Sequence, residues 1–230
     1  MTHTQAYNPL DKINLAKSIK TELLQRPTVS LGGPHRMVGA GVHVIYYTGK
    51  FRAYAPISEA NTALSFGQPI YVGKAIPKGG RKGGLTKDVA AKGHALADRL
   101  KQHASSVTEA SNLELAEFHV RYLVVNDIWI PLGENMLIET FKPIWNRAID
   151  GFGNKDPGRR RATQFKSPWD VLHPGRKFAH KLADSPATPE LLKKRIEDYF
   201  AGRRLTPLPK AVVKQQAKKK AEAEELADNV

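Results

Sequence analysis

Gly41-Val42-His43 and Tyr71-Val72-Gly73-Lys74 are the two stretches that decide the fold of this chain. The first opens a run from Val42 to Tyr47 that is rich in β-branched and aromatic residues, which predicts a strand. The second belongs to a run from Pro69 to Gly73, which predicts a second, shorter strand. Because side chains alternate between the faces of a strand, His43 is expected on the face opposite to Val42.

Hydrophobic periodicity predicts the elements around these strands. Apolar residues at helical spacing predict four helices, over residues 10–25, from about His94, over residues 132–141 and from Pro189 to about Gly202. Alternation over residues 118–124 predicts a third strand, and residues 48–68 are expected to form an irregular, turn-rich connection. This order of elements predicts an α+β fold with a small, mainly antiparallel sheet flanked by helices.

The length of 230 residues fits one substantial domain with extensions at both ends. We expect residues 1–34 to be an N-terminal helical extension and residues 35–202 to be the core with its insertions. Residues 203–230 are rich in Lys, Ala and Glu and contain few apolar residues, so we expect a charged, flexible, partly helical tail.

The composition points to a polyanionic partner and limits the possible chemistry. The formal net charge is +14, which attracts phosphate over long range but also fits a ribosomal protein. The chain has no cysteine, which excludes disulfides, thiolate metal sites and cysteine nucleophiles. It shows neither a signal-peptide pattern nor an apolar stretch of the ~18 residues that a membrane span requires, so we expect a cytoplasmic protein without membrane contact.

Basic residues gather in two segments that are candidates for DNA binding. Residues 74–101 hold eight basic residues against two acidic ones, and residues 158–177 hold six against one. Such runs usually contact phosphate or lie in solvent, although arginine also reads guanine in the major groove. The candidate DNA-binding residues are Lys74, Lys78, Arg81, Lys82, Arg159, Arg160 and Arg161.

A second set of residues suits phosphodiester hydrolysis. That reaction needs a base for the attacking water, positive charge near the phosphate, and an acid or metal for the leaving oxygen. Arg99 and His103 are one helical turn apart and can face one phosphate, while Glu134 is a hard oxygen ligand suited to Mg²⁺. Each of these residues also has an ordinary interpretation, as part of a solvated helix face or as a partner of a helix dipole.

The order of these residues resembles that of the GIY-YIG nucleases, in which two strand motifs precede a helical arginine and a helical glutamate. The resemblance covers roughly residues 35–200 and is closest to the type II restriction endonuclease branch, whose members cut the palindrome CCGCGG. It rests on Gly39–Val42 with Tyr46–Gly49, Pro69–Ala75, Lys142–Asn146, Asp150–Asn154 and Trp169–Arg176.

This resemblance implies a GIY-YIG sheet and a role for each matching residue. Tyr71 would hydrogen-bond near the attacking water, Arg99 would hold the scissile phosphate, and His103 would orient the phosphate or relay a proton. Glu134 would bind a single Mg²⁺, for which Mn²⁺ can substitute, and Asn146 would help to fix that site. Lys74 would add a phosphate contact.

His43 departs from the family, which has tyrosine at this position. An imidazole with an unperturbed pKa near ~6.5 is an easier general base at neutral pH than a phenol, so His43 is a candidate catalytic base. It is also shorter than a tyrosine, and the alternative is that it inactivates or tunes the site. Of its neighbours Tyr46 and Tyr47, only Tyr47 shares its strand face and is placed to compensate.

We therefore expect a Mg²⁺-dependent, sequence-specific endonuclease for double-stranded DNA. A palindromic site implies a homodimer, with a tetramer as the alternative, and a restriction enzyme implies a companion DNA methyltransferase. Two other functions fit the sequence: a DNA-binding protein on a weakened nuclease scaffold, and a basic RNA-binding protein.

Overall fold

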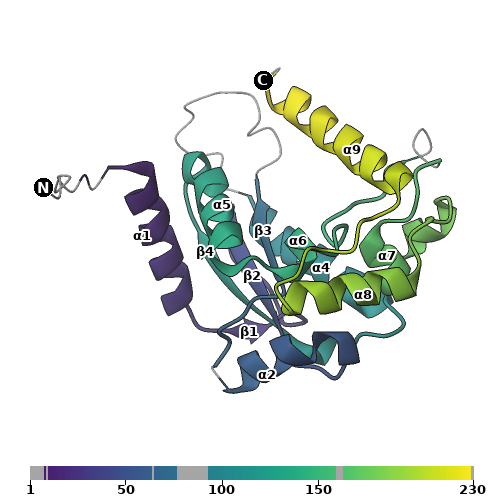
Figure 1. The fold of residues 1–230 in the computed structure, drawn as a ribbon. Coiled ribbons are helices and arrows are strands. Elements are labelled where there is room, and N and C mark those ends of the chain that lie inside the picture. Colours follow the sequence, from purple (N-terminus) through teal and green to yellow (C-terminus); the bar gives the residue numbers. More distant parts are fainter. Residues whose placement is uncertain (1–7, 9, 64, 77–92, 159–162, 229–230) are drawn as a thin grey trace, which may run out of the picture.

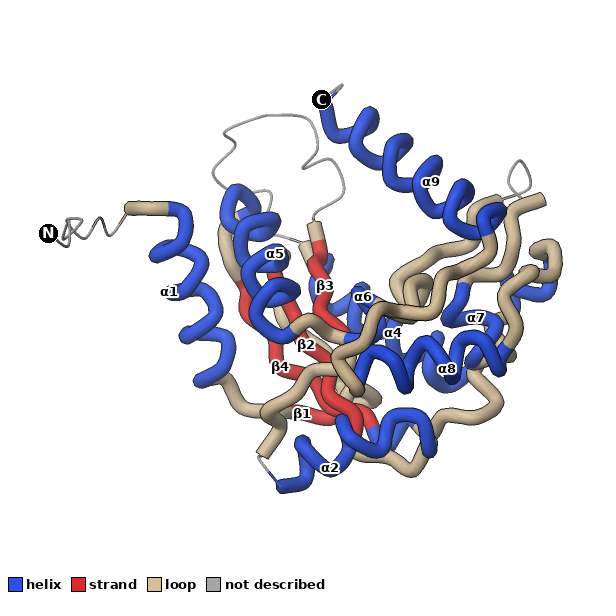
Figure 2. Tube along the Cα trace, in the orientation of Figure 1, coloured by secondary structure: helices blue, strands red, loops and turns tan. Residues whose placement is uncertain are grey.

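A four-stranded antiparallel sheet forms the centre of the molecule (Figures 1 and 2). The computed structural model describes residue 8 and residues 10–63, 65–76, 93–158 and 163–228. The strands are β1 (Val29–Ser30), β2 (Gly41–Tyr47), β3 (Tyr71–Ala75) and β4 (Phe118–Val124), in the order β1-β4-β2-β3. In this register His43 of β2 lies opposite Gly73 of β3 on one side and Tyr122 of β4 on the other.

Helices cover both faces of the sheet (Figure 1). On one face, α1 (Lys12–Gln25) and α5 (Ile130–Phe141) pack on Val42, Val44 and Val72. On the other face lies a larger core, in which Ile45 and Tyr71 pack beneath the remaining helices. The helices on that side include α4 (Ala95–Glu109), α6 (Ile144–Arg147), α7 (Pro168–Leu172) and α8 (Pro189–Phe200). Both faces of β2 are buried, which explains why its residues on both faces are apolar or aromatic apart from His43.

The predicted α+β class, the three predicted strands and the four predicted helices are confirmed. The start of α8 follows the sequence signal directly, since the Thr188 hydroxyl accepts a hydrogen bond from the Leu191 N–H and Pro189 occupies the first turn. The end of α5 is marked by Lys142 in the left-handed conformation, directly before Pro143. The start of α8 and the end of α5 are therefore both encoded by neighbouring residues.

Three details of the sequence interpretation are wrong. The connection over residues 48–68 contains a 3₁₀ turn (Arg52–Tyr54) and a helix, α2 (Ala55–Ala63), which begins close to Pro56. The second strand starts at Tyr71, two residues later than Pro69, and the short β1 has no counterpart among the predicted strands.

The segment after residue 202 is tied more closely to the domain than its composition suggests. It continues into α9 (Lys210–Asp228), whose first turn buries Val212 in the larger core. Gln215 then exchanges two hydrogen bonds with the backbone of Phe165, at 2.7 and 3.1 Å. One apolar residue and one amide side chain thus fix the base of a helix that composition alone describes as a flexible tail.

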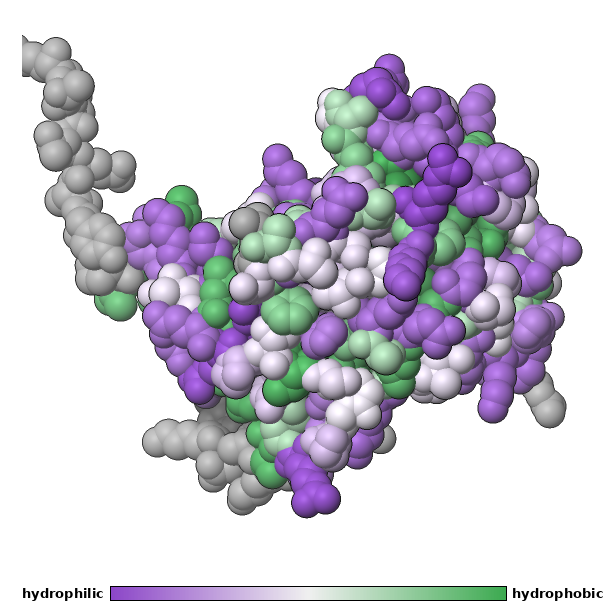
Figure 3. Space-filling model, turned by 90° about the horizontal axis from the view of Figure 1, so that it is seen from below, coloured by the Kyte–Doolittle hydropathy of each residue, from purple (hydrophilic) through white to green (hydrophobic). Residues whose placement is uncertain are grey.

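The surface agrees with the charged composition. On the face seen in Figure 3, hydrophilic side chains are interspersed with smaller apolar patches. No helix in the described part of the chain is long and apolar enough to cross a membrane.

Candidate functional site

His43 lies fully buried at the centre of the candidate site. Its ring is 5.0 Å from the ring of His103 and 6.1 Å from that of Tyr71, measured between centroids. A Cβ added to Gly73 would lie 2.8 Å from His43 Nε2 and 2.8 Å from the Tyr71 ring. Only glycine at position 73 therefore leaves room for these two side chains to converge.

The helix α4 brings two further predicted residues to the same place. His103 is buried, stacks on Phe152 at 4.6 Å and meets the edge of Tyr71 at 5.2 Å. Arg99, one turn earlier, donates from Nη2 to the carbonyl of Gly153 at 2.9 Å and from Nη1 to Gln102 at 3.2 Å. The structure thus places Arg99 and His103 in one cluster with Tyr71 and the loop of Phe152 and Gly153.

Several buried nitrogen atoms in this cluster have no hydrogen-bond partner among the described residues. They are Nδ1 and Nε2 of His43 and Nε2 of His103. Buried polar atoms are nearly always satisfied, so unpaired ones require an explanation. Three such atoms in two adjacent rings, beside Tyr71 and Arg99, favour a site that takes up a polar group.

Burial determines the protonation states in the cluster. It lowers the pKa of His43 to about 3, with a further contribution from the positive charge of Arg99. The pKa of His103 is likewise lowered well below its usual value, chiefly by burial. Burial raises the pKa of Tyr71, an effect that Arg99 opposes and Glu134 adds to. At neutral pH the cluster therefore holds two neutral imidazoles and a protonated phenol next to one guanidinium.

The pKa of His43 is thus far below the unperturbed imidazole value from which the sequence argument for a catalytic base started. The physical reason is that both faces of β2 are covered, which strand patterning alone does not reveal. The neutral ring still has a lone pair that can accept a proton, but it is a weaker base than a solvated histidine. Its neighbours are engaged elsewhere: the Tyr46 hydroxyl accepts from Arg121, and the Tyr47 hydroxyl accepts from the Phe51 N–H.

Glu134 lies on α5, which packs on the face of the sheet opposite to the core that contains Tyr71 and Phe152. Its Oε2 lies 2.7 Å from Nζ of Lys74 on β3, and its charge is felt by the Tyr71 phenol. Lys74, the expected phosphate contact, here neutralises this carboxylate. Among the described residues, no three His, Cys, Asp or Glu side chains form a group that could hold a metal. The donor set fits Mg²⁺ nevertheless, because this ion often takes one carboxylate and completes its shell with water and substrate phosphate.

Asn146 lies beside the cluster, and both the oxygen and the nitrogen of its side-chain amide bind the backbone of β3. Its Oδ1 accepts from the Val72 N–H at 2.8 Å, and its Nδ2 donates to the Val72 carbonyl at 2.9 Å. It therefore holds the outer edge of β3 directly next to Tyr71. This contact suits the expected task of fixing the site, through the strand rather than through a ligand.

The remaining DNA-binding candidates lie outside the described residues. They are Lys78, Arg81, Lys82, Arg159, Arg160 and Arg161.

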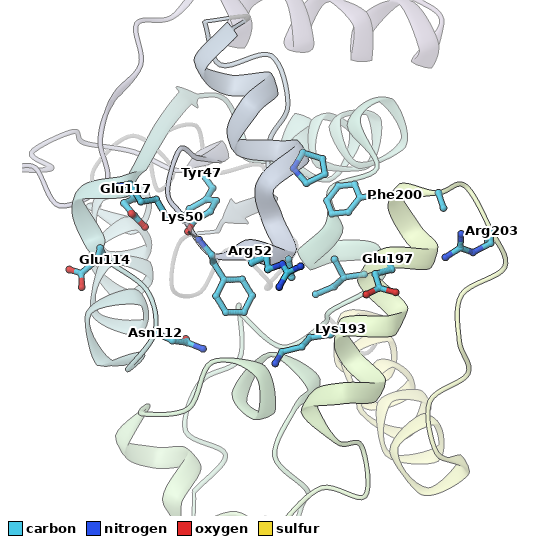
Figure 4. A pocket seen from close by; sticks show the side chains of 15 residues that line it. Tyr47, Lys50, Arg52, Asn112, Glu114, Glu117, Lys193, Glu197, Phe200 and Arg203 are labelled. Carbon is cyan, nitrogen blue, oxygen red and sulfur yellow. Dashed lines mark hydrogen bonds between the residues drawn. The ribbon is translucent and has the colours of Figure 1, made fainter.

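A groove of about 1220 Å³ lies elsewhere, between α8 and the segment after β2 (Figure 4). None of the predicted catalytic residues lines it. Its charged residues nearly balance, with Lys50, Arg52, Lys193 and Arg203 against Glu114, Glu117 and Glu197. A phosphate-binding surface should be mainly positive, so this groove is not the candidate nuclease site.

Sequence reasoning assigned no role to the residues that support His103 and Arg99 from the loop 151–154. Phe152 and Gly153 make the contacts to His103 and Arg99, and the buried Arg176 binds the carbonyls of Gly151, Phe152 and Asn154. A Cβ on Gly153 would lie 2.8 Å from the Tyr71 hydroxyl and 2.9 Å from Arg99 Nη2. The only available signal is the pattern Gly151-Phe152-Gly153, whose role depends on contacts with distant segments.

The comparison with known families decides the class of this site. Residues 35–200 match the family described as the Eco29kI GIY-YIG domain. The chain belongs to this family. As an Eco29kI GIY-YIG domain it is a nuclease of a restriction endonuclease family, and the small antiparallel sheet agrees with that assignment. A comparison with curated proteins gave no match.

The buried histidines predict acid sensitivity of this GIY-YIG domain. Burial lowers the pKa of both His43 and His173 to about 3. Between that value and the unfolded value near ~6.5, the unfolded chain binds protons that the native protein excludes, so stability is present above about pH 6.5 and is lost as pH falls. We expect each ring to lower the free energy of unfolding by about 2 kcal/mol between about pH 7 and pH 5.

Urea denaturation at a series of pH values measures this loss. His43→Gln should remove the share of one buried ring, about 2 kcal/mol, whereas His180→Gln, which changes an exposed ring, should leave the loss unchanged. A stability that is flat from about pH 7 to pH 5 would contradict the burial of these neutral rings.

Proposed function

We propose that this protein is a Mg²⁺-dependent, sequence-specific endonuclease that hydrolyses double-stranded DNA within a GC-rich palindrome, CCGCGG. The observation that carries the proposal is the convergence of His43, Tyr71, Arg99 and His103, with Glu134 in electrostatic reach, in a domain of a restriction nuclease family. The palindrome rests on the resemblance to the branch that cuts it.

In the proposed reaction, a water oxygen forms a bond to phosphorus and one P–O ester bond breaks. Arg99 binds the scissile phosphate with guanidinium N–H groups that its bonds to Gly153 and Gln102 leave available, and offsets the negative charge that grows there. The protonated Tyr71 hydroxyl orients the attacking water. His43, neutral at working pH, accepts the proton that this water loses. His103 holds the phosphate or relays a proton through its unpaired Nε2.

Glu134 is the residue that would hold Mg²⁺ or Mn²⁺. When the ion and DNA bind, Lys74 would give up its ion pair with Glu134 and bind a phosphate oxygen instead. The ion would stabilise negative charge on the leaving oxygen, by several kcal/mol for a typical Lewis acid. Asn146 keeps β3, and with it Tyr71, in place.

A two-fold symmetric site favours a two-fold symmetric protein, so we propose a homodimer as the working assembly, with a tetramer as the form that acts on two sites. A cell that carries such an enzyme also needs a DNA methyltransferase that protects its own sites.

Cleavage of supercoiled plasmid and of mixed-sequence DNA tests the proposal. We expect discrete fragments with Mg²⁺ or Mn²⁺ and none with a chelator, and sequencing of the fragment ends identifies the site. Binding of duplex DNA without cleavage in either metal would favour the weakened scaffold. Preferential binding of RNA would favour the alternative of a basic RNA-binding protein.

The proposed DNA contacts predict a strong dependence of affinity on salt. The logarithm of the binding constant should fall with the logarithm of salt concentration by about 0.9 for each phosphate neutralised. Arg160→Ala should reduce that slope by about one unit. Lys194→Ala, which removes an exposed lysine paired with acidic residues on α8, serves as the control and should leave the slope unchanged. An affinity that is the same at low and physiological salt would rule out these contacts.

A further inference from the structure

Arg176 is a buried arginine that takes no part in the reaction proposed above. Its side chain is 1% exposed and donates from Nε to Oδ1 of Asp170 at 2.7 Å. Asp170 is equally buried, and its other oxygen accepts from the Ser167 hydroxyl at 2.6 Å. Trp169 packs against the guanidinium at 4.5 Å from its carbon to the ring centroid. The position of Arg176 is thus fixed on several sides.

The remaining nitrogens of Arg176 all bind one short loop. Nη2 donates to the carbonyl of Gly151 at 2.9 Å, and Nη1 donates to that of Phe152 at 2.9 Å, with a longer contact of 3.4 Å to that of Asn154. The planar fork of a guanidinium holds several acceptors in a fixed geometry, which the point charge of lysine cannot reproduce. The pair of Asp170 and Arg176 therefore determines the path of residues 151–154.

The same loop supplies both supports of the candidate catalytic residues on α4. The carbonyl of Gly153 accepts from Arg99 Nη2 at 2.9 Å, and the Phe152 ring stacks on His103 at 4.6 Å and 14°. Phe152 also meets Tyr71 at 5.0 Å. A shift of this loop would therefore move the guanidinium and the imidazole together.

We propose that Arg176, held by Asp170, is a positioning residue of the nuclease site. It fixes residues 151–154 so that Gly153 and Phe152 aim Arg99 and His103 at the phosphate. It does not touch the DNA, because it is buried behind the loop. The inference rests on the proposed function for its effect on cleavage, but the geometry that it assigns exists in the free protein.

The first test is the variant Arg176→Lys, which keeps the charge beside Asp170 and loses the fork. We expect it to fold and to bind duplex DNA with the affinity of the parent, while single-turnover cleavage is slower by about 10²-fold, the scale of a displacement near ~1 Å. Arg121→Lys is the matched control. It alters a guanidinium that bonds the carbonyls of Arg26 and Phe66 on the other face of the sheet, and should keep the parental rate.

A double-mutant cycle separates positioning from general destabilisation. If Arg176 acts through Arg99, Arg176→Lys should slow cleavage far less in an Arg99→Gln background than in the parent. An equal loss in both backgrounds, or a parental rate in Arg176→Lys alone, would overturn the inference.

An NMR measurement without DNA distinguishes this inference from the proposed function. Phe152 should shift the ring protons of His103 upfield, and Arg176→Lys should reduce that shift at unchanged overall fold. If the shift changes but the parent protein does not cut DNA, the inference stands and the proposed function fails. If the shift is unaltered, the positioning role is wrong whatever the parent cleaves.

Discussion

Glu134→Gln should lower the single-turnover rate of DNA cleavage by at least about a thousandfold at saturating Mg²⁺, because several kcal/mol of charge stabilisation on the leaving oxygen would be lost. The amide keeps the size of the side chain, and the ion pair with Lys74 is partly exposed, so the fold should be unaffected. Binding of duplex DNA without divalent ions should remain within a fewfold of the parent.

Glu139→Gln provides the control for this prediction. It removes a carboxylate from the same helix, but one that lies on the surface and pairs with Arg147. It should cleave at the parental rate. Parental cleavage by Glu134→Gln over a full Mg²⁺ titration would show that the ion is held elsewhere.

The second large effect is expected at His43. His43→Ala should cut about 10²- to 10⁴-fold more slowly, the usual contribution of a positioned base, and bind DNA normally. His43→Tyr introduces the tyrosine that the resemblance implies for this position and should retain cleavage. If His43→Ala cuts like the parent, another group accepts the proton, and the candidates are the adjacent rings of His103, at 5.0 Å, and Tyr71, at 6.1 Å.

The pH dependence provides a separate readout for His43. Its pKa is lowered to about 3, so the neutral form that accepts a proton persists from alkaline pH down to that region. We therefore expect no tenfold loss of kcat/KM per pH unit between about pH 7 and pH 5 that depends on His43. An inflection near ~6.5, the pKa of a solvated imidazole, that disappears in His43→Tyr would mean that this ring is solvated during the reaction.

The sequence is a good guide where the information is local. The strand at residues 118–124 and the cap of α8 at Thr188 follow from alternation and capping, which depend only on neighbouring residues. The order of motifs alone also assigns Tyr71, Arg99 and Glu134 to one site. These assignments need only spacing and residue type.

The sequence is a poor guide where contacts join distant segments. The neutral state of His43 depends on α4 and on the loop 151–154, which cover its strand face. The hydrogen bonds of the Asn146 amide with Val72 depend on how α6 packs beside β3. Nothing near Arg176 in the sequence indicates that it binds three carbonyls more than twenty residues away.

The contact between Asn146 and β3 has a consequence for how copies of this protein can associate. Strand β3 is an edge strand, and edge strands with free main-chain groups invite pairing with another molecule. Here the side-chain amide of Asn146 binds both the N–H and the carbonyl of Val72, as a neighbouring strand would. The backbone N–H of Trp145 donates to the carbonyl of Ile70. At the opposite edge, β1 is only two residues long. Both borders of the sheet therefore discourage strand addition, which protects against aggregation and leaves helices and loops as the surfaces through which two subunits can meet.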